Sequence, residues 1–331
     1  MPAWWVPGPH VQTVWGKLVR RPRVVPTRTE HWPTPDDDSV EMRRLDSPRP
    51  DAPRLLVLHG LEGTIRSHYL QGMLARCRAL GWAADVLIFR SCNGVVPRAR
   101  RMYHSGETTD LDLAVRRLVA ESPGRPLLLA GFSLGGNVLL KWLGEQGDAV
   151  PRQVVAAAAV SVPFDLERGA RQIERGVARV YTTHFLETLR RKALAKLAMH
   201  PDAFDAVRLQ AATSLYEFDD AVTAPLHGFA SATDYYTRSS ALGFLAAIRR
   251  PTLLLSARDD PFLPRAVLDE VLSVAARNPQ LVTDFPEHGG HVGFVAGRLP
   301  GRPVYWGEQR VVHFLEARVT GSAFTTSSSR Q

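Results

Sequence analysis

The sequence has few cysteines and no long apolar run. Two cysteines, Cys77 and Cys92, are too few for a disulfide framework, and no Cys-x-x-Cys metal motif is present. The longest strongly apolar stretch, residues 154–164, has 11 residues, whereas a membrane-spanning helix needs about 20. The first ten residues have neither the basic nor the apolar region of a secretory signal peptide. The sequence therefore predicts a cytoplasmic protein with reduced thiols and no transmembrane helix.

Lysine is also scarce, although the chain is basic. There are 41 Lys and Arg residues against 33 Asp and Glu, which gives a formal net charge of +8. An excess of this size can indicate a nucleic-acid or acidic-membrane partner. Only four of the 41 are lysines, so the excess is scattered arginine, and the densest basic segments, 98–101 and 190–192, lack interleaved aromatics. We expect no nucleic-acid partner, and nothing in the sequence requires membrane association.

The length and composition are typical of a large globular domain, alone or with an insertion. The chain has 331 residues, of which 45% are hydrophobic and 22% charged. From residue 54 onward, short apolar runs alternate with amphipathic helical stretches, which indicates a mostly parallel sheet covered by helices on both faces. The predicted strands are 55–60, 84–90, 126–133, 153–163 and 250–260, and the predicted helices are 67–81, 105–121 and 136–146.

The pattern divides the chain into five segments. Residues 1–50, rich in Pro and Trp, are expected to wrap the core or add antiparallel strands, and residues 51–163 form the first part of the core. Residues 164–249 read as helices, which is more than one strand-to-strand crossover needs, so they are expected to form a cap. Residues 250–320 complete the core, and the low-complexity residues 321–331 are expected to be a disordered tail.

One motif places a serine between a predicted strand and a predicted helix. Residues 131–135 read Gly-Phe-Ser-Leu-Gly. A nucleophilic serine lies in a strained strand-to-helix turn, and the flanking glycines avoid a clash with neighbouring backbone. The pattern is common by itself, but its position at the end of a strand favours Ser133 as a nucleophile.

A second motif, His-Gly-Leu-Glu-Gly at residues 59–63, closes an earlier predicted strand. A loop at this place in the sheet can stabilise the negative oxygen that develops when a nucleophile attacks a carbonyl group. The predicted donors of this oxyanion hole are the backbone N–H groups of Leu61 and Leu134. Losing one such donor typically raises the barrier by about 3 kcal/mol.

A serine nucleophile needs a histidine to take its proton and a carboxylate to orient that histidine. Downstream, Asp259 and Asp260 follow a predicted strand, and His288 and His291 lie in a glycine-rich loop. We favour Asp260, in the turn Asp-Pro-Phe-Leu-Pro, over Asp259, which suits a turn or capping role. We favour His291, which lies between glycines, over His288. The His-x-x-His spacing lacks a third metal ligand, so no metal and no organic cofactor are expected.

Seven blocks of residues in order resemble the YheT-like α/β-hydrolases, a family that includes mammalian esterases and lipases of the ABHD type. The blocks span most of the chain: Pro-His-Val-Gln-Thr (9–13), His-Gly-Leu-Glu-Gly (59–63), Phe-Arg-Ser-Cys-Asn-Gly (89–94), Tyr-His-Ser-Gly-Glu-Thr (103–108), Gly-Phe-Ser-Leu-Gly-Gly-Asn (131–137), Asp-Asp-Pro-Phe (259–262) and Gly-Gly-His-Val-Gly-Phe (289–294). The resemblance implies a serine esterase or lipase whose triad matches Ser133, Asp260 and His291. One departure is Ser91, where the family pattern Phe-Arg-Gly has glycine.

Other polar and aromatic residues in these regions have two interpretations. Arg90, His104, Ser105 and Glu107 could line a pocket, but an ion pair between Arg and Glu that joins two loops explains them as well, and we assign them no catalytic role. Asn137, one turn into the predicted helix, suits a structural role. The cap aromatics suit either an acyl pocket or cap packing: Phe185, Phe218, Tyr235, Tyr236 and Phe244.

The sequence as a whole predicts an α/β-hydrolase fold with a helical cap. Its predicted activity is hydrolysis of small-molecule carboxylic esters, lipid-like ones included, through an acyl-enzyme. An acyltransferase or thioesterase with the same triad is an alternative, and so is a non-catalytic binding protein on the same fold. Substrate identity, acyl chain length and oligomeric state do not follow from the sequence.

Overall fold

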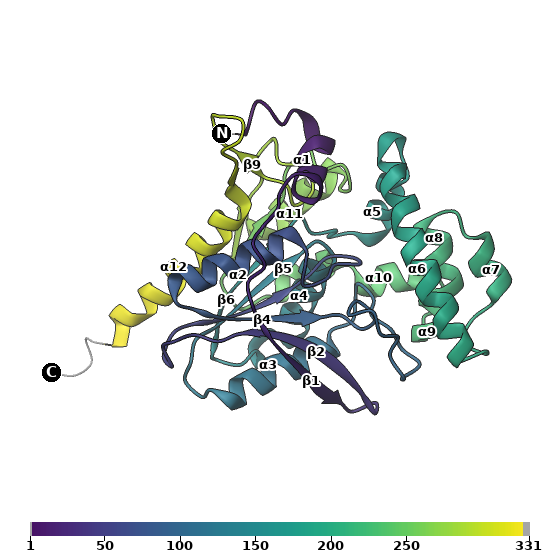
Figure 1. The fold of residues 1–331 in the computed structure, drawn as a ribbon, viewed down its shortest axis with the longest axis horizontal. Coiled ribbons are helices and arrows are strands. Elements are labelled where there is room, and N and C mark those ends of the chain that lie inside the picture. Colours follow the sequence, from purple (N-terminus) through teal and green to yellow (C-terminus); the bar gives the residue numbers. More distant parts are fainter. Residues whose placement is uncertain (1, 327–331) are drawn as a thin grey trace.

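An eight-stranded sheet lies at the centre of the computed structural model, which describes residues 2–326 and the side chains of residues 2–320 (Figure 1). The strand order is β1-β2-β4-β3-β5-β6-β7-β8, and β3 to β8 run parallel to their neighbours in this set. The strands are β1 (Arg28–Thr34), β2 (Asp38–Leu45), β3 (Arg54–Leu58), β4 (Ala83–Ile88), β5 (Leu127–Phe132), β6 (Val154–Val160), β7 (Thr252–Leu255) and β8 (Leu281–Asp284). Strands β3 to β7 are almost wholly buried and apolar, as parallel strands covered on both faces must be.

The N-terminal strands extend the sheet in the antiparallel sense. Strand β1 pairs with β2, and β2 pairs with β4. Their burial alternates more than that of the central strands, because β1 forms the edge of the sheet. Antiparallel strands are one of the two arrangements expected for residues 1–50. A separate two-stranded sheet, β9 (Val295–Ala296) and β10 (Val304–Tyr305), lies nearer the C-terminus.

Helices cover both faces of the sheet. Helices α2 and α12 pack together on one face, and α3, α4 and the short helix η4 pack on the other (Figure 1). The core helices are α1 (Gly8–Leu18), α2 (His68–Leu80), α3 (Thr109–Glu121), α4 (Leu134–Gln146), α11 (Arg265–Ala275) and α12 (Trp306–Thr326), with the short helices η1 (Gly147–Ala149) and η4 (Ala241–Ala247). Together with the sheet, this arrangement is the α/β-hydrolase fold.

A helical segment between β6 and β7 stands beside the core and forms the cap (Figure 1). Its apolar side chains form two clusters of their own, one around Leu186, Leu209 and Phe218 and the other around Tyr235 and Tyr236. The cap helices are α5 (Leu166–Ile173), η2 (Gly176–Ala178), α6 (Arg179–Met199), α7 (Ala206–Ala211), α8 (Leu215–Phe218), the π-helix η3 (Asp219–Thr223), α9 (Ala224–His227) and α10 (Ala232–Ser239).

Two elements differ from the sequence-based expectation. Strand β8 was not predicted, because it has only four residues and three of them are half-buried. Helix α12 continues to Thr326, so residues 321–326 are helical, although residues 321–331 were expected to be disordered. A helix already docked on the sheet and on α2 can extend at little cost even where Ser and Thr are frequent. Residues 327–331 lie outside the described residues. No described helix is both long and apolar enough to cross a membrane.

Candidate active site

Ser133 occupies the turn between β5 and α4. Its backbone has φ 52° and ψ −121°, a conformation that L-residues rarely adopt. The turn also brings α4 against the loop after β3: a side chain at Gly135 would meet the carbonyl oxygen of His59, and a Cβ at Gly60 would lie 3.1 Å from the Cβ of Ser133. The glycines are therefore needed for close approach of the two segments, and the strained turn presents the Ser133 side chain.

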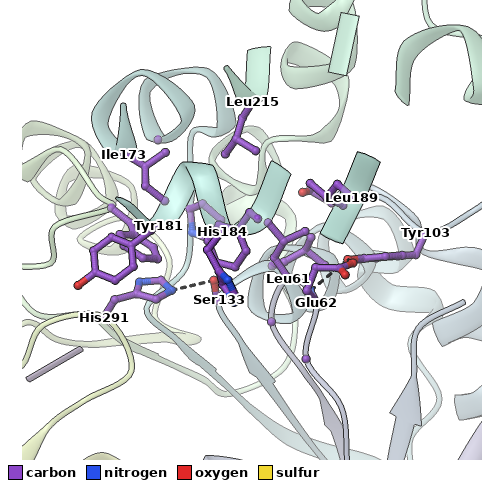
Figure 2. A pocket seen from close by; sticks show the side chains of 18 of the residues that line it. Leu61, Glu62, Tyr103, Ser133, Ile173, Tyr181, His184, Leu189, Leu215 and His291 are labelled. Atoms are coloured by element: carbon purple, nitrogen blue, oxygen red, sulfur yellow. Dashed lines mark hydrogen bonds between the residues drawn. The ribbon is translucent and has the colours of Figure 1, made fainter. Parts of the chain in front are cut away.

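Three predicted site residues are joined by hydrogen bonds. The Oγ of Ser133 lies 2.9 Å from Nε2 of His291 (Figure 2). On the other side of the ring, Nδ1 of His291 lies 2.8 Å from Oδ2 of Asp260. The carboxylate can only accept, so Nδ1 carries the proton and Nε2 is free to accept the Ser133 hydroxyl. Asp260 and His291 are only 4% and 9% exposed, respectively, so water competes little for this chain of bonds.

The sheet explains why residues so distant in sequence meet. Ser133 follows β5, Asp260 follows β7 and His291 follows β8, and all three strands run parallel. Their C-terminal ends therefore lie along one edge of the sheet, where ligands bind in open α/β folds. Strand β3 is the immediate neighbour of β5 and delivers Leu61 to the same edge.

Asp259 and His288, the alternatives to Asp260 and His291, make other contacts. Asp259 accepts hydrogen bonds from the N–H groups of Gly289 and Gly290, each at 2.9 Å, and lies 3.2 Å from Nδ1 of His288. The His288 side chain is 67% exposed. Asp259 thus holds the backbone of the histidine loop, as a capping residue would, and Asp260 is the carboxylate that reaches His291.

Two backbone donors near Ser133 are unused, one in the loop after β3 and one at the start of α4. Among the described residues, no acceptor is hydrogen-bonded to the N–H of Leu61 or of Leu134. The adjacent Gly60 N–H donates to the Tyr69 hydroxyl at 2.9 Å. His59 donates from Nδ1 to the Gly60 carbonyl and accepts the N–H of Phe89 at Nε2. Burial lowers the pKa of His59 to about 4, so the ring is neutral and can make both bonds at neutral pH.

A lysine of the cap contacts the same loop, which sequence reasoning missed. Lys192 of α6 donates to the Glu62 carboxylate at 2.7 Å, and the Tyr103 hydroxyl donates to the same oxygen at 2.6 Å. Glu62 adopts a φ of 55°, and its N–H donates to the Tyr103 hydroxyl. These bonds tie the cap to the residue that follows Leu61. No pattern in the sequence relates position 62 to position 192.

The N-terminal helix positions the histidine loop, a role that sequence reasoning also missed. The Thr13 hydroxyl accepts the His291 N–H at 2.9 Å and donates to the Pro9 carbonyl. Gln12 is buried; its amide oxygen accepts the Val295 N–H, and its amide nitrogen donates to the Val295 carbonyl. The only sequence signal for this role was the resemblance of residues 9–13 to the family pattern. That resemblance did not indicate which residues the segment contacts.

Structural contacts account for three polar residues near the site: Arg90, Asn137 and Glu107. Arg90 is buried and pairs with Asp110 and Asp36, rather than with Glu107. Asn137 donates from its amide to the carbonyls of Ser105 and Ser239 and accepts the N–H of Ala241, so it joins α4 to two loops. Glu107 pairs with Arg101.

Ser91 has a φ of 69°. Glycine adopts this conformation without strain, which explains why the family pattern has glycine at this position. The Ser91 Oγ is buried, and no described residue is its hydrogen-bond partner.

A cavity of about 570 Å³ opens onto Ser133 and His291. Figure 2 shows Ile173, Leu189 and Leu215 of the cap pointing toward the same space. Four of the five cap aromatics line the cavity: Phe185, Phe218, Tyr235 and Tyr236. The fifth, Phe244, packs against α4 at Gly144 instead. Within the described residues, no group of three or more His, Cys, Asp or Glu side chains could hold a metal ion.

Comparisons with known proteins identify the family of this chain. The family model described as "Serine aminopeptidase, S33" matches residues 101–289. The Escherichia coli (strain K12) protein named "Putative esterase YheT" is 38% identical over 92% of this chain and 89% of its own length. The Mus musculus protein "Phospholipase ABHD3" is 31% identical over 81% of this chain, which spans 64% of that protein.

A solved structure has the same fold. The Pyrococcus furiosus esterase Pf2001 superposes with a TM-score of 0.57 at 14% identity, over 88% of this chain and 91% of the esterase. At this identity the likeness concerns the fold alone. The family match, the close relative and the fold agree: the chain belongs to the YheT-like family of α/β-hydrolases and is a carboxylic ester hydrolase.

Proposed function

We propose that Ser133, His291 and Asp260 are the catalytic triad of this hydrolase and that Leu61 and Leu134 form its oxyanion hole. The observation that carries this proposal is the hydrogen-bonded chain from Ser133 through His291 to Asp260 at the floor of the cavity. The two backbone N–H groups beside Ser133 that are bonded to no described residue support it further. A group of this kind performs acyl transfer on unrelated folds.

The reaction has two steps. In the first, His291 takes the Ser133 proton through Nε2 while Oγ attacks the ester carbonyl, and the oxyanion accepts hydrogen bonds from Leu61 and Leu134. His291 then gives the proton to the leaving alcohol, and an acyl-serine remains. In the second step, His291 activates a water molecule that releases the acid. Asp260 keeps the ring oriented and stabilises its charged form.

The cavity favours a lipid-like substrate over a short-chain ester. Its volume of about 570 Å³ is within the range of ligand pockets, and the surface of its wall is mostly apolar, with leucine, isoleucine and aromatic side chains among the lining residues. Burying each methylene group of an acyl chain contributes about 0.8 kcal/mol. We therefore propose esters with a medium or long acyl chain as the substrate class.

The test is hydrolysis of p-nitrophenyl esters from acetate to palmitate by the wild type and by variants of confirmed fold. We expect kcat/KM to rise from acetate toward the medium-length chains. Ser133→Ala should reduce hydrolysis to near the background rate, and Asp260→Asn should lower kcat by about 10⁴-fold. His288→Ala is the matched control, because this histidine lies three residues from His291 and does not reach Ser133; it should retain nearly full activity.

Two results would contradict the proposal. If Ser133→Ala kept substantial activity, a different nucleophile would be responsible. If the wild type released p-nitrophenol but passed the acyl group to an added alcohol in preference to water, the protein would be an acyltransferase, and the second step would need to be rewritten.

A further inference from the structure

One part of the cavity wall contains polar side chains that the acyl-enzyme mechanism does not use. His104, from the loop before α3, and His227, the last residue of α9, both line the cavity. Their ring centroids lie 4.4 Å apart. Two imidazoles in a mainly apolar wall are costly unless each polar nitrogen has a hydrogen-bond partner.

His227 has no such partner. The ring nitrogens of His227 make no hydrogen bond to any described residue. They are also not fully enclosed by the protein. The His227 ring lines the cavity, so these nitrogens are available to a ligand there. Helix α9 directly follows the π-helix η3, and π-helical turns are frequent at functional sites.

His104 is partly satisfied, which determines where its proton is. Nδ1 accepts the N–H of Gly106 at 3.1 Å, so the proton lies on Nε2. The carboxylate of Glu107 is 3.9 Å from Nε2, too far for a hydrogen bond. Nε2–H is therefore a donor that a ligand in the cavity can use.

The character of this wall selects the class of ligand. Burial lowers the pKa of His104 to about 3 and that of His227 well below its usual range, so both rings are neutral at pH 7. Two cations act on His104, and both are already paired: Lys141 with Glu145, and Arg101 with Asp36, Glu107 and Asp110. The wall thus offers neutral donors and an acceptor but no available cation, which suits a neutral group that both donates and accepts.

We infer that His104 and His227 form a subsite for an alcohol hydroxyl of the substrate, separate from the oxygen atoms of the ester bond that is cleaved. The geometry favours a hydroxyl because His104 offers a donor, and His227 offers a donor on one nitrogen and an acceptor on the other. The Tyr235 hydroxyl, which accepts the Ser105 N–H at 2.9 Å, lies in the same wall and keeps its own proton for donation. This inference rests on the proposed function, since it assigns a substrate group to the same cavity.

The hydroxyl could belong to a polyol leaving group or to the acyl chain, and three substrates distinguish these sources. Ethyl decanoate has no free hydroxyl, 1-decanoylglycerol has hydroxyls on the alcohol side, and ethyl 10-hydroxydecanoate has one on the acyl side. Released acid is titrated for all three. Selectivity is the ratio of kcat/KM for a hydroxyl-bearing ester to that for ethyl decanoate.

The test compares the wild type with His227→Phe and His227→Gln. Phenylalanine keeps the ring without its nitrogens, whereas glutamine keeps a donor and an acceptor. We expect His227→Phe to lower the selectivity for one of the two hydroxyl-bearing esters about tenfold or more, because the unpaired hydroxyl loses about 1–3 kcal/mol. Hydrolysis of ethyl decanoate should change less than threefold, and His227→Gln should retain most of the selectivity. His184→Phe is the control, since His184 lines the cavity but contacts Lys17 at 2.9 Å.

The outcomes separate this inference from the proposed function. Unchanged selectivity in His227→Phe, with hydrolysis still dependent on Ser133, would overturn the subsite and leave the proposed function intact. An equal loss of selectivity in His184→Phe would also overturn it, because the effect would then be general to the cavity. A wild type that hydrolyses none of the three esters would overturn both. Circular dichroism and a thermal melt of each variant establish that it is folded.

Discussion

At the scale of single residues, backbone strain accompanies the chemistry. Ser133, Glu62 and Val292 all have positive φ values, and each lies in or beside a segment that carries a proposed site residue. Such conformations cost about 1–3 kcal/mol each, so the surrounding bonds must hold them. The bonds are present: Tyr103 holds Glu62, and Ser161 accepts the Val292 N–H at 3.0 Å.

Ser91 is also strained, but its side chain has no described hydrogen-bond partner that would compensate for the strain. We predict that Ser91→Gly stabilises the protein by about 1 kcal/mol. Removing left-handed strain and a buried, unpartnered hydroxyl gains about 2 kcal/mol, and the added freedom of glycine in the unfolded chain offsets about half. Urea unfolding of both proteins would measure this difference. A variant less stable than the wild type would mean that the Ser91 hydroxyl makes a bond that the structure does not contain.

At the scale of elements, the cap and the core are joined at the loop after β3. Helix α6 reaches the loop through Lys192 and Glu62, which are 15% and 11% exposed in their side chains. Asn137 of α4 also connects the core to the segments before α3 and after α10. The cap is therefore placed by polar contacts at the site itself as well as by its own apolar clusters.

The Lys192 contact leads to a prediction about kcat. Lys192→Met should lower kcat about tenfold or more and change KM less, because the buried Glu62 carboxylate loses its counter-ion and the loop that carries Leu61 shifts. The double variant Lys192→Met with Glu62→Gln should recover most of the activity, since the uncompensated charge is gone.

Steady-state kinetics on a medium-chain ester would measure both effects. Lys17→Met, which removes a lysine bonded to His184 at the cavity mouth, serves as the control for loss of positive charge. If the double variant were as impaired as the single one, the ion pair would have no specific role in positioning the loop.

At the scale of the whole molecule, buried histidines make stability depend on pH. Burial lowers the pKa of His59 and of His68 to about 4 and that of His104 to about 3. A histidine whose pKa is lowered in the folded state contributes fully to stability above its unfolded pKa, which is near 6.5. That contribution is lost as pH falls toward its folded pKa. Burial raises the pKa of Asp219 to about 6, and this group works in the opposite direction over nearly the same range.

We predict that the free energy of unfolding falls between pH 7.5 and pH 5. Each of the three histidines lowers it by about 2 kcal/mol at pH 5, whereas Asp219 raises it by about 1 kcal/mol, so the histidines dominate. Urea unfolding at both pH values would measure the change. His68→Phe should reduce the difference in unfolding free energy between the two pH values, because it removes one of the titrating groups. The substitution breaks no hydrogen bond at Nδ1 of His68, since that atom has no described partner. A stability that stayed constant or rose toward pH 5 would contradict the prediction.

The sequence alone determined the central sheet and pointed to Ser133, the proposed nucleophile. Strands β3 to β7 could be read from it because each is a short apolar run, and burial on both faces of a parallel sheet requires that composition. Ser133 could be found because the steric demand of the strand-to-helix turn is local, and neighbouring glycines satisfy it. Strand β8 could not be found, since a strand of four residues, three of them half-buried, carries too little hydrophobic pattern.

Tertiary structure decided everything that depends on contacts between distant segments. The sequence only favoured Asp260 and His291 over their neighbours, and it is the adjacent ends of β7 and β8 that bring these two together. The bonds from Thr13 to His291 and from Lys192 to Glu62 join residues 278 and 130 positions apart. Local periodicity reports which face of an element is buried, but it contains no information on which distant side chain will lie opposite, because that is determined by how the elements pack.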